Sequence, residues 1–312
     1  MLRYIAQRLL AIIPIVLGIS FLIFAIMSLT PGDPARMILG ENVPQYEVDA
    51  LREEMGLNDN VLVQYGRYMF NAIRGDLGQS YLSGLPVMEE ILERFPTTVK
   101  VALGAVILSV GIGIPLGVLS AVKRYSIIDN VTMFFTMVMT SMPNFWFGLV
   151  LLLVFSLKLG WVPAAGATSW QHYILPCLTL SCNSMALILR LTRSTMLEEV
   201  RQDYVRTARS KGAKESTVIF KHALRNSLLP VITVAGLQFS LQLGGSMIVE
   251  NVFAIPGLGT LIINSVKMKD TPTVVAGIMF IAIVGCIVNL LVDLVYTVVD
   301  PRVKAQLAKQ RG

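Results

Sequence analysis

Charge is scarce in this sequence of 312 residues. Asp, Glu, Lys and Arg together make up 15% of it, whereas hydrophobic residues make up 54%. A soluble domain usually carries about 25% charged residues, so the composition argues against an ordinary soluble enzyme. The same composition excludes a disordered chain, a collagen and a coiled coil.

Groups for metal binding and catalysis are also few. The three cysteines, Cys177, Cys182 and Cys286, lie in apolar surroundings without CxxC spacing, so neither a disulfide framework nor a zinc site is expected. No G-x-x-x-x-G-K-[ST] phosphate loop occurs, and we therefore expect no ATP hydrolysis by this chain alone. No nucleophile–base pair or metal cluster is evident either, which disfavours a membrane enzyme.

Long apolar runs are what the sequence does contain. A helix that crosses a bilayer needs about 20 apolar residues. Hydropathy predicts six such spans, at roughly 9–29, 97–122, 128–158, 172–192, 227–249 and 273–299. The third is interrupted at Pro143 and is either one broken or tilted span or two short segments. One span is the better count, because few polar residues separate its halves.

The distribution of basic residues sets the orientation. Most of the 26 Lys and Arg residues fall in the segments that are cytoplasmic if both termini are inside, including Arg302, Lys304, Lys309 and Arg311 of the tail. The net charge of +6 is therefore a topology signal, and no nucleic-acid partner is expected. The first apolar run exceeds the length usual for a signal peptide and has no A-x-A site after it, so an uncleaved span is expected.

Three regions are predicted. Residues 1–29 form the N-terminus and first span, 30–96 a soluble helical insertion on the outer side, and 97–312 a five-helix core. Helical spacing within the insertion predicts one helix ending at Gly56, a second ending at Gly75 and a third short helix beginning at Pro86. A segment of this length is expected either to contact another protein or to form a packed cap.

Small and polar residues recur inside the spans at helical spacing. Gly113 and Gly117 in the second span, and Gly236 with Ser240 and Gly244 in the fifth, predict close helix packing. Polar side chains are costly against lipid, so those in the spans should face other helices or a water-filled path. The candidates to line such a path are Asn144, Gln238, Gln242 and Ser246, with Asn183 and Ser184 weaker.

The cytoplasmic loop at 193–230 has the pattern of a docking element. Met196, Val200, Tyr204 and Ala208 predict one face of a helix that Gly212 ends. A second short amphipathic helix is predicted next, with apolar contacts at Val218, Ile219, Ala223 and Leu224, before re-entry into the membrane at Pro230.

Motifs that run in order along the chain carry a resemblance. They are P-G-D-P-A at 31–35, G-D-L-G-x-S at 75–80, L-G-W-V-P at 159–163, D-Y-x-R-T-A-R-x-K-G at 203–212, H-A-L-R-N-S-L-L-P at 222–230, E-N-V-F at 250–253, P-G-L-G at 256–259 and D-P-R at 300–302. With them the sequence resembles the permease subunits of bacterial ABC importers, in the peptide/nickel branch and of the dipeptide/oligopeptide "B" type. Of the general EAA-x3-G pattern only Ala208 and Gly212 coincide, and I-x-L-P would fall sooner after the glycine than Leu229-Pro230 does.

The resemblance implies a fold and a set of partners. The fold is the all-α type I importer permease with six transmembrane helices and both termini cytoplasmic, in the bacterial plasma membrane. A second homologous permease, two ATP-binding subunits and an extracytoplasmic substrate-binding protein complete the importer, and ATP with Mg²⁺ binds in the partner subunits, with no cofactor in this chain. The residues implied to contact the ATPase are Asp203, Tyr204, Arg206, Ala208, Gly212, Ala213, Lys214 and Glu215.

The cargo stays open at this point. Di- and oligopeptides are the first expectation, while nickel chelates and glutathione are the alternatives, because permeases for all of them share the motifs. A stand-alone channel or ion-driven carrier is the competing class. The absence of acidic residues at mid-depth in the first five spans argues against proton coupling.

Overall fold

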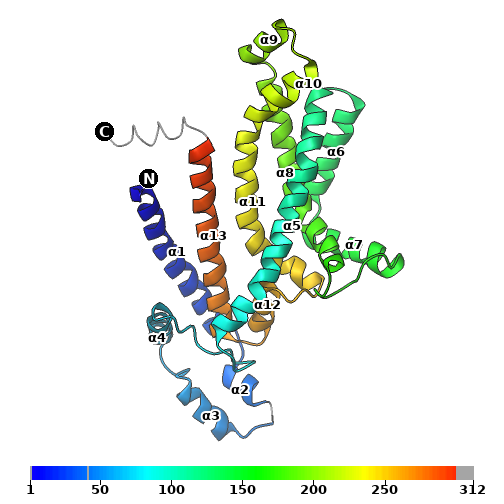
Figure 1. Ribbon diagram of the computed structural model, residues 1–312. Coiled ribbons are helices and arrows are strands. Elements are labelled where there is room, and N and C mark those ends of the chain that lie inside the picture. The colour runs from blue at the N-terminus through cyan, green and yellow to red at the C-terminus, as the bar shows by residue number, and fades with distance from the viewer. Residues whose placement is uncertain (1, 41, 300–312) are drawn as a thin grey trace. The chain divides into compact units, whose positions relative to one another are not determined.

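The computed structural model describes residues 2–40 and 42–299, and helices dominate this part of the chain (Figure 1). Its only extended pairing is an isolated bridge between Gln79 and Pro86. Five helices are long and apolar enough to cross a membrane, and a bent pair makes up to six. The motif at Asp300-Pro301-Arg302 and the basic tail after it lie outside the described residues.

The predicted apolar runs all form helices. They are α1 (Leu2–Leu29), α5 (Val87–Val122), α6 (Ile127–Ser141) with α7 (Asn144–Leu151) and the π-helix η1 (Leu152–Lys158), α8 (Ile174–Glu199), α11 (Leu224–Val252) and α13 (Thr271–Val299). The predicted interruption at Pro143 is confirmed, since α6 and the segment after it are bent by 104°. Proline restricts the residue before it to extended backbone, and Met142 has φ −89° and ψ 131°.

The contacts divide the described chain into two units. The first holds residues 2–40, 42–99 and 254–286, and the second holds 100–253 and 287–299. Besides α1, the first unit contains α2 (Pro34–Leu39), α3 (Gln45–Glu54), α4 (Val61–Ile73) and α12 (Leu258–Lys267). Its apolar core joins α1 to α13 through Phe24, Val275 and Met279, against which Tyr65 and Met69 of α4 pack.

The insertion folds largely as its glycines predict. α3 ends before Gly56, and Gly75 follows α4, with φ of 66° and 90° at the two glycines. The left-handed backbone there favours glycine, so both predicted ends are confirmed. The predicted third short helix is wrong, because Pro86 precedes α5, which runs without a break through the second span. A break would leave backbone N–H and C=O groups without partners near the membrane, so a continuous helix is favoured.

Two motifs of the insertion have structural roles within the first unit. Asp33 of P-G-D-P-A accepts a hydrogen bond from the backbone N–H of Ala35 at 3.2 Å and so caps α2, which Pro34 begins. Ser80 of G-D-L-G-x-S donates to Asp270 at 2.6 Å. Asp270 is fully buried and also accepts from the backbone N–H of Tyr81 and the hydroxyl of Thr273, at 3.1 and 2.7 Å. The loop before α13 therefore anchors the insertion.

In the second unit α8 is central and packs against α11, α6 and α7 (Figure 1). A Cβ on Gly113 or Gly117 of α5 would lie 3.0 or 2.7 Å from a backbone carbonyl oxygen of α8. A Cβ on Gly236 of α11 would lie 2.4 Å from Val292 of α13. The predicted packing role is therefore confirmed for these three glycines, since no larger residue fits without a shift.

Candidate functional site

The cytoplasmic segment is a short exposed helix set off from the span before it. α8 ends at Glu199, and α9 (Asp203–Ser210) begins after a turn at 200–202. The prediction of one continuous helix with Tyr204 on its apolar face is wrong. Val205 is the fully buried residue of α9, while Tyr204 is exposed and its hydroxyl bonds to Glu199. No glycine or proline marks the break, so composition alone did not reveal it.

Gly212 closes α9 as predicted. Its φ is 78°, its N–H donates to the carbonyl of Arg209 at 2.9 Å, and the N–H of Ala213 donates to Ala208 at 3.2 Å. These two bonds form a Schellman turn, which satisfies carbonyls that the helix end would otherwise leave open. A Cβ at Gly212 would meet nothing within 4 Å, so only the left-handed backbone demands glycine here.

An ion pair braces this turn on its exposed side. The guanidinium of Arg209 meets the carboxylate of Glu215 through two bonds, at 3.1 and 2.7 Å. The hydrogen bonds to Glu215 raise the pKa of Arg209 above its usual value. An exposed pair contributes about 0–1 kcal/mol, so its effect is to fix the direction in which α10 (Glu215–Thr217) leaves the turn.

The base of this element is apolar and packs on the inner ends of two spans. Ala223 and Met196 are buried together with Val118 and Ala121 of α5, and Ile219 and Leu224 pack against them. The predicted apolar contacts are therefore confirmed. The predicted separate helix is not, because α10, the π-helix η3 (Val218–Ala223) and α11 are continuous and Pro230 lies inside α11. The segment that follows the Gly212 turn is therefore packed against α5 and α8.

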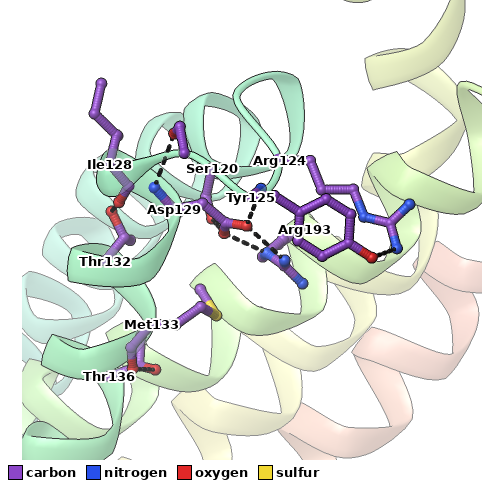
Figure 2. Close-up of polar contacts among 10 residues, drawn as sticks. Ser120, Arg124, Tyr125, Ile128, Asp129, Thr132, Met133, Thr136 and Arg193 are labelled. Carbon is purple, nitrogen blue, oxygen red and sulfur yellow. Dashed lines mark hydrogen bonds and ion pairs between the residues drawn. The ribbon is translucent and has the colours of Figure 1, made fainter.

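A buried ion pair joins α6 to α8 in the same unit (Figure 2). Both carboxylate oxygens of Asp129 accept from Arg193, at 2.7 and 2.8 Å. Asp129 also accepts from the hydroxyl of Ser120 and, at 3.0 Å, from the backbone N–H of Tyr125. Only 2% of its side chain is exposed, so the charge depends on these four donors.

Sequence reasoning missed Asp129. A signal for it existed, since Ser126 three residues earlier caps α6 and both Asp129 and Arg193 fall at predicted inner ends of spans. The partners are 64 positions apart in the sequence, so no local pattern indicated that they pair.

The candidate path residues lie at different depths within the second unit. Gln242 and Ser246 are buried inside the chain, whereas Asn144 and Gln238 are half-buried. Gln242 donates to Ser184 at 2.8 Å, and Ser184 shares a hydrogen bond with Ser109 at 2.7 Å. The weaker candidates thus turn out to be partners of the stronger ones, because Asn183 likewise donates to Asn144 at 2.9 Å.

Two amide oxygens in this region have no partner among the described residues. They belong to Gln242 and Asn183. A buried acceptor without a donor costs about 1–3 kcal/mol, so a buried water that donated to these oxygens would stabilise the chain. The fourth member of the stripe on α11 is Glu250, which is fully buried and accepts from Ser246 at 3.0 Å.

No group of three or more His, Cys, Asp or Glu side chains that could hold a metal occurs in residues 2–40 and 42–299. The geometry instead combines a helical membrane bundle with an exposed, braced helix coupled to it. This arrangement is that of a membrane protein with a cytoplasmic element that another protein could contact.

The comparisons with known proteins identify the class. Residues 113–305 match the model of the binding-protein-dependent transport system inner membrane component, and residues 1–102 match the N-terminal model of the same system. The chain belongs to this family. It is a permease subunit of an ABC importer of the peptide/nickel branch, a multi-pass protein of the inner membrane, and works in a complex with ATPase and binding-protein partners.

Individual relatives match along nearly the whole chain. The glutathione transport system permease protein GsiC of Escherichia coli O6:H1 is 41% identical over 97% of this chain and 99% of its own. GsiC of Escherichia coli K12 is 40% identical over the same shares. Among solved structures, the inward-facing MetNI methionine ABC transporter matches with a TM-score of 0.58 and 18% identity, over 68% of this chain and 97% of that chain. This likeness shows the fold, that of a type I importer permease.

Proposed function

We propose that the chain imports glutathione or similarly short peptides and forms half of their translocation path. The observation that supports this choice of cargo is the 41% identity with a glutathione permease along nearly the full length of both chains. Nickel chelates remain the alternative within the same branch. The binding protein would select the cargo, and this chain would let it pass.

The importer we propose contains this chain and one homologous permease, arranged as a heterodimer. Two ATP-binding subunits would supply the ATP and Mg²⁺ sites and hydrolyse ATP, so that this chain itself is no enzyme. The exposed α9 and the Gly212 turn would dock on one of these subunits. The apolar base at Met196 and Ala223 supports this role, because it packs the segment after the Gly212 turn against α5 and α8.

The proposed docking surface is formed by the predicted coupling residues. In α9 and the turn after it, Asp203, Tyr204, Arg206, Gly212, Lys214 and Glu215 are exposed, and Ala208 and Ala213 are half-buried. The proposed path surface is the stripe of Gln238, Gln242 and Ser246 with Asn144. Amide groups bind peptide backbones without regard to side chain, which suits cargo of variable sequence.

Uptake measurements test the cargo. Cells that lack their own glutathione and peptide importers would express this chain with its partner subunits and take up labelled glutathione, a dipeptide or a nickel chelate. We expect glutathione or short peptides to accumulate in a manner that depends on ATP and on the binding protein. Accumulation of nickel chelate alone would overturn the proposed cargo, and transport by the purified chain in liposomes without ATP would overturn the importer mechanism.

Gly212 tests the coupling role. Gly212→Val places a β-branched residue at a φ of 78°, which strains the turn by about 1–2 kcal/mol. We expect uptake and cargo-stimulated ATPase activity to fall at least severalfold while insertion and complex assembly persist. Gly212→Asn is the matched control, since asparagine tolerates left-handed backbone and should retain activity. Normal uptake by a stably expressed Gly212→Val variant would contradict the role.

A further inference from the structure

Helix α4 of the insertion is fastened to the side of the first span. The hydroxyl of Tyr65 donates to the carbonyl of Leu17 at 3.1 Å and shares a hydrogen bond with Ser20 at 2.9 Å. The Tyr65 ring also meets Phe21 and Phe24 edge-on, with centroids 5.2 and 5.7 Å apart. These contacts belong to α1 itself and not to the loop that follows it.

The depth of these contacts follows from helix geometry. The apolar run of α1 ends at Leu29, and the polar Thr30 and Asp33 follow. At about 1.5 Å per residue, Ser20 lies about 13 Å inward from Leu29 along the helix axis. On the same scale Leu17 lies about 18 Å inward, so the contacts of α4 with α1 extend through the outer half of a hydrocarbon core about 30 Å thick, to near its middle.

The side chains of α4 divide into three stripes. One stripe, with Val61, Tyr65, Tyr68 and Met69, packs on the core formed by α1 and α13. A second stripe is polar, and its Gln64, Arg67 and Asn71 line a cavity of about 380 Å³ within the same unit. Asp33 and Arg52 also line that cavity, with their charged groups 3.3 Å apart, so its walls are polar and charged.

The third stripe is apolar and exposed. Leu62, Val63, Phe70 and Ile73 have 64%, 53%, 56% and 80% of their surface accessible. At about 100° per residue these side chains project from one sector of the helix, and Gly66 is the only other residue in it. In water, four adjacent large apolar side chains of this exposure would be a liability, whereas against lipid they are favourable.

We infer that α4 lies in the outer leaflet as an in-plane amphipathic helix. The stripe of Leu62, Val63, Phe70 and Ile73 contacts lipid acyl chains, and the polar stripe faces the cavity and water. Arg74 at the end of the helix places its guanidinium 3.9 Å over the Phe70 ring, from where it reaches the headgroups. The occupant of the exposed stripe is therefore lipid, because the attachment to α1 already lies at hydrocarbon depth.

Nitroxide labels on single cysteines test this inference. In a chain whose Cys177, Cys182 and Cys286 are replaced by alanine, Leu62→Cys, Phe70→Cys and Ile73→Cys would each be labelled, with Asn71→Cys on the polar stripe as the matched control. The full importer complex in lipid nanodiscs would then be exposed to oxygen, which partitions into lipid, and to a water-soluble nickel chelate. Relaxation of each label by both reagents is measured.

We expect the ratio of oxygen to nickel accessibility to be severalfold higher at Leu62, Phe70 and Ile73 than at Asn71. A ratio at all three positions equal to that at Asn71 would place α4 in water and overturn the inference. Protection of all three from both reagents would also overturn it, because a protein and not lipid would then cover the stripe. The measurement requires no transport, so it is independent of the proposed cargo and coupling.

Discussion

Asp129 and Asp270 are both almost completely buried, and each carboxylate is held by several donors. Asp129 has a full ionic partner in Arg193, whereas Asp270 has hydroxyl and backbone donors. Burial, together with the carboxylate of Asp270, raises the pKa of Tyr81 to about 12, so this phenol stays protonated at any physiological pH. At the scale of single residues, charge in this chain joins segments that are far apart in sequence.

Asp129→Asn should destabilise the chain strongly. The change keeps the shape of the side chain but leaves Arg193 without a carboxylate. We expect a loss of about 3 kcal/mol, at the low end for a broken buried pair, because 23% of the Arg193 side chain is exposed. Thermal unfolding of the complex in detergent measures this as a lower midpoint.

An exposed pair supplies the control. Asp59 meets Arg67 at 2.5 Å with 43% and 53% of the two side chains exposed, so Asp59→Asn should cost about 0–1 kcal/mol. Equal shifts of the midpoint for Asp129→Asn and Asp59→Asn would show that the Asp129–Arg193 pair contributes no more than a surface contact.

At the scale of helices, glycine decides how closely α5 approaches α8. Gly104, Gly113 and Gly117 each leave room for an atom of α8 that a Cβ would meet at 2.6–3.0 Å. In a membrane, such close backbone approach replaces the hydrophobic effect as the source of helix association. The inner ends of α5 and α8 are joined a second time by the cluster around Met196. The two helices are therefore packed together at mid-depth and at their inner ends.

Gly117→Ala should weaken this packing. Its Cβ would lie 2.7 Å from the carbonyl oxygen of Leu189 and from the Cβ of Thr192, so the helices must separate at a cost of about 1–3 kcal/mol. Gly111→Ala in the same helix meets nothing within 4 Å and should be neutral or stabilise by about 0.5–1 kcal/mol. Unfolding midpoints of the two variants check this, and a shift for Gly111→Ala as large as that for Gly117→Ala would refute it.

At the scale of the whole molecule, the orientation of the chain depends on its third apolar segment. α6 and α7 with η1 are bent by 104°, and this pair is either one broken crossing or a loop that returns to the same side. A single crossing places the basic segment at 193–230 in the cytoplasm, in agreement with the positive-inside rule. A returning loop would place it outside, away from any ATPase.

Labelling of single cysteines from outside the cell distinguishes a single crossing from a returning loop. In a cysteine-free chain, we expect Thr168→Cys to react with an impermeant maleimide on intact cells and Ser210→Cys to react only after permeabilisation. Both positions are exposed in this chain, so access to the reagent depends on the membrane when the chain is expressed without its ATP-binding subunits. Labelling of Ser210→Cys in intact cells would exclude the single crossing.

The sequence predicted the spans well, because lipid tolerates only helices of a set length and apolarity. It also predicted the ends of helices at Gly56, Gly75 and Gly212, where backbone conformation requires glycine. It did not predict the break at 200–202, after which α9 buries Val205 in place of Tyr204. The pairing of Asp129 with Arg193 and the attachment of Tyr65 to α1 depend on tertiary structure and have no local pattern. The candidate path and coupling residues remain predictions.

The π-helix η3 bears on how such chains can change in length. A π-turn winds one extra residue into a helix. In a regular α-helix, one inserted residue would rotate everything after it by about 100°. Because η3 lies between the Gly212 turn and α11, an insertion or deletion of one residue there can be absorbed locally. Gln242 and Ser246 would then keep their orientation in the bundle. The proposed docking segment can therefore change in length while the stripe on α11 stays in place.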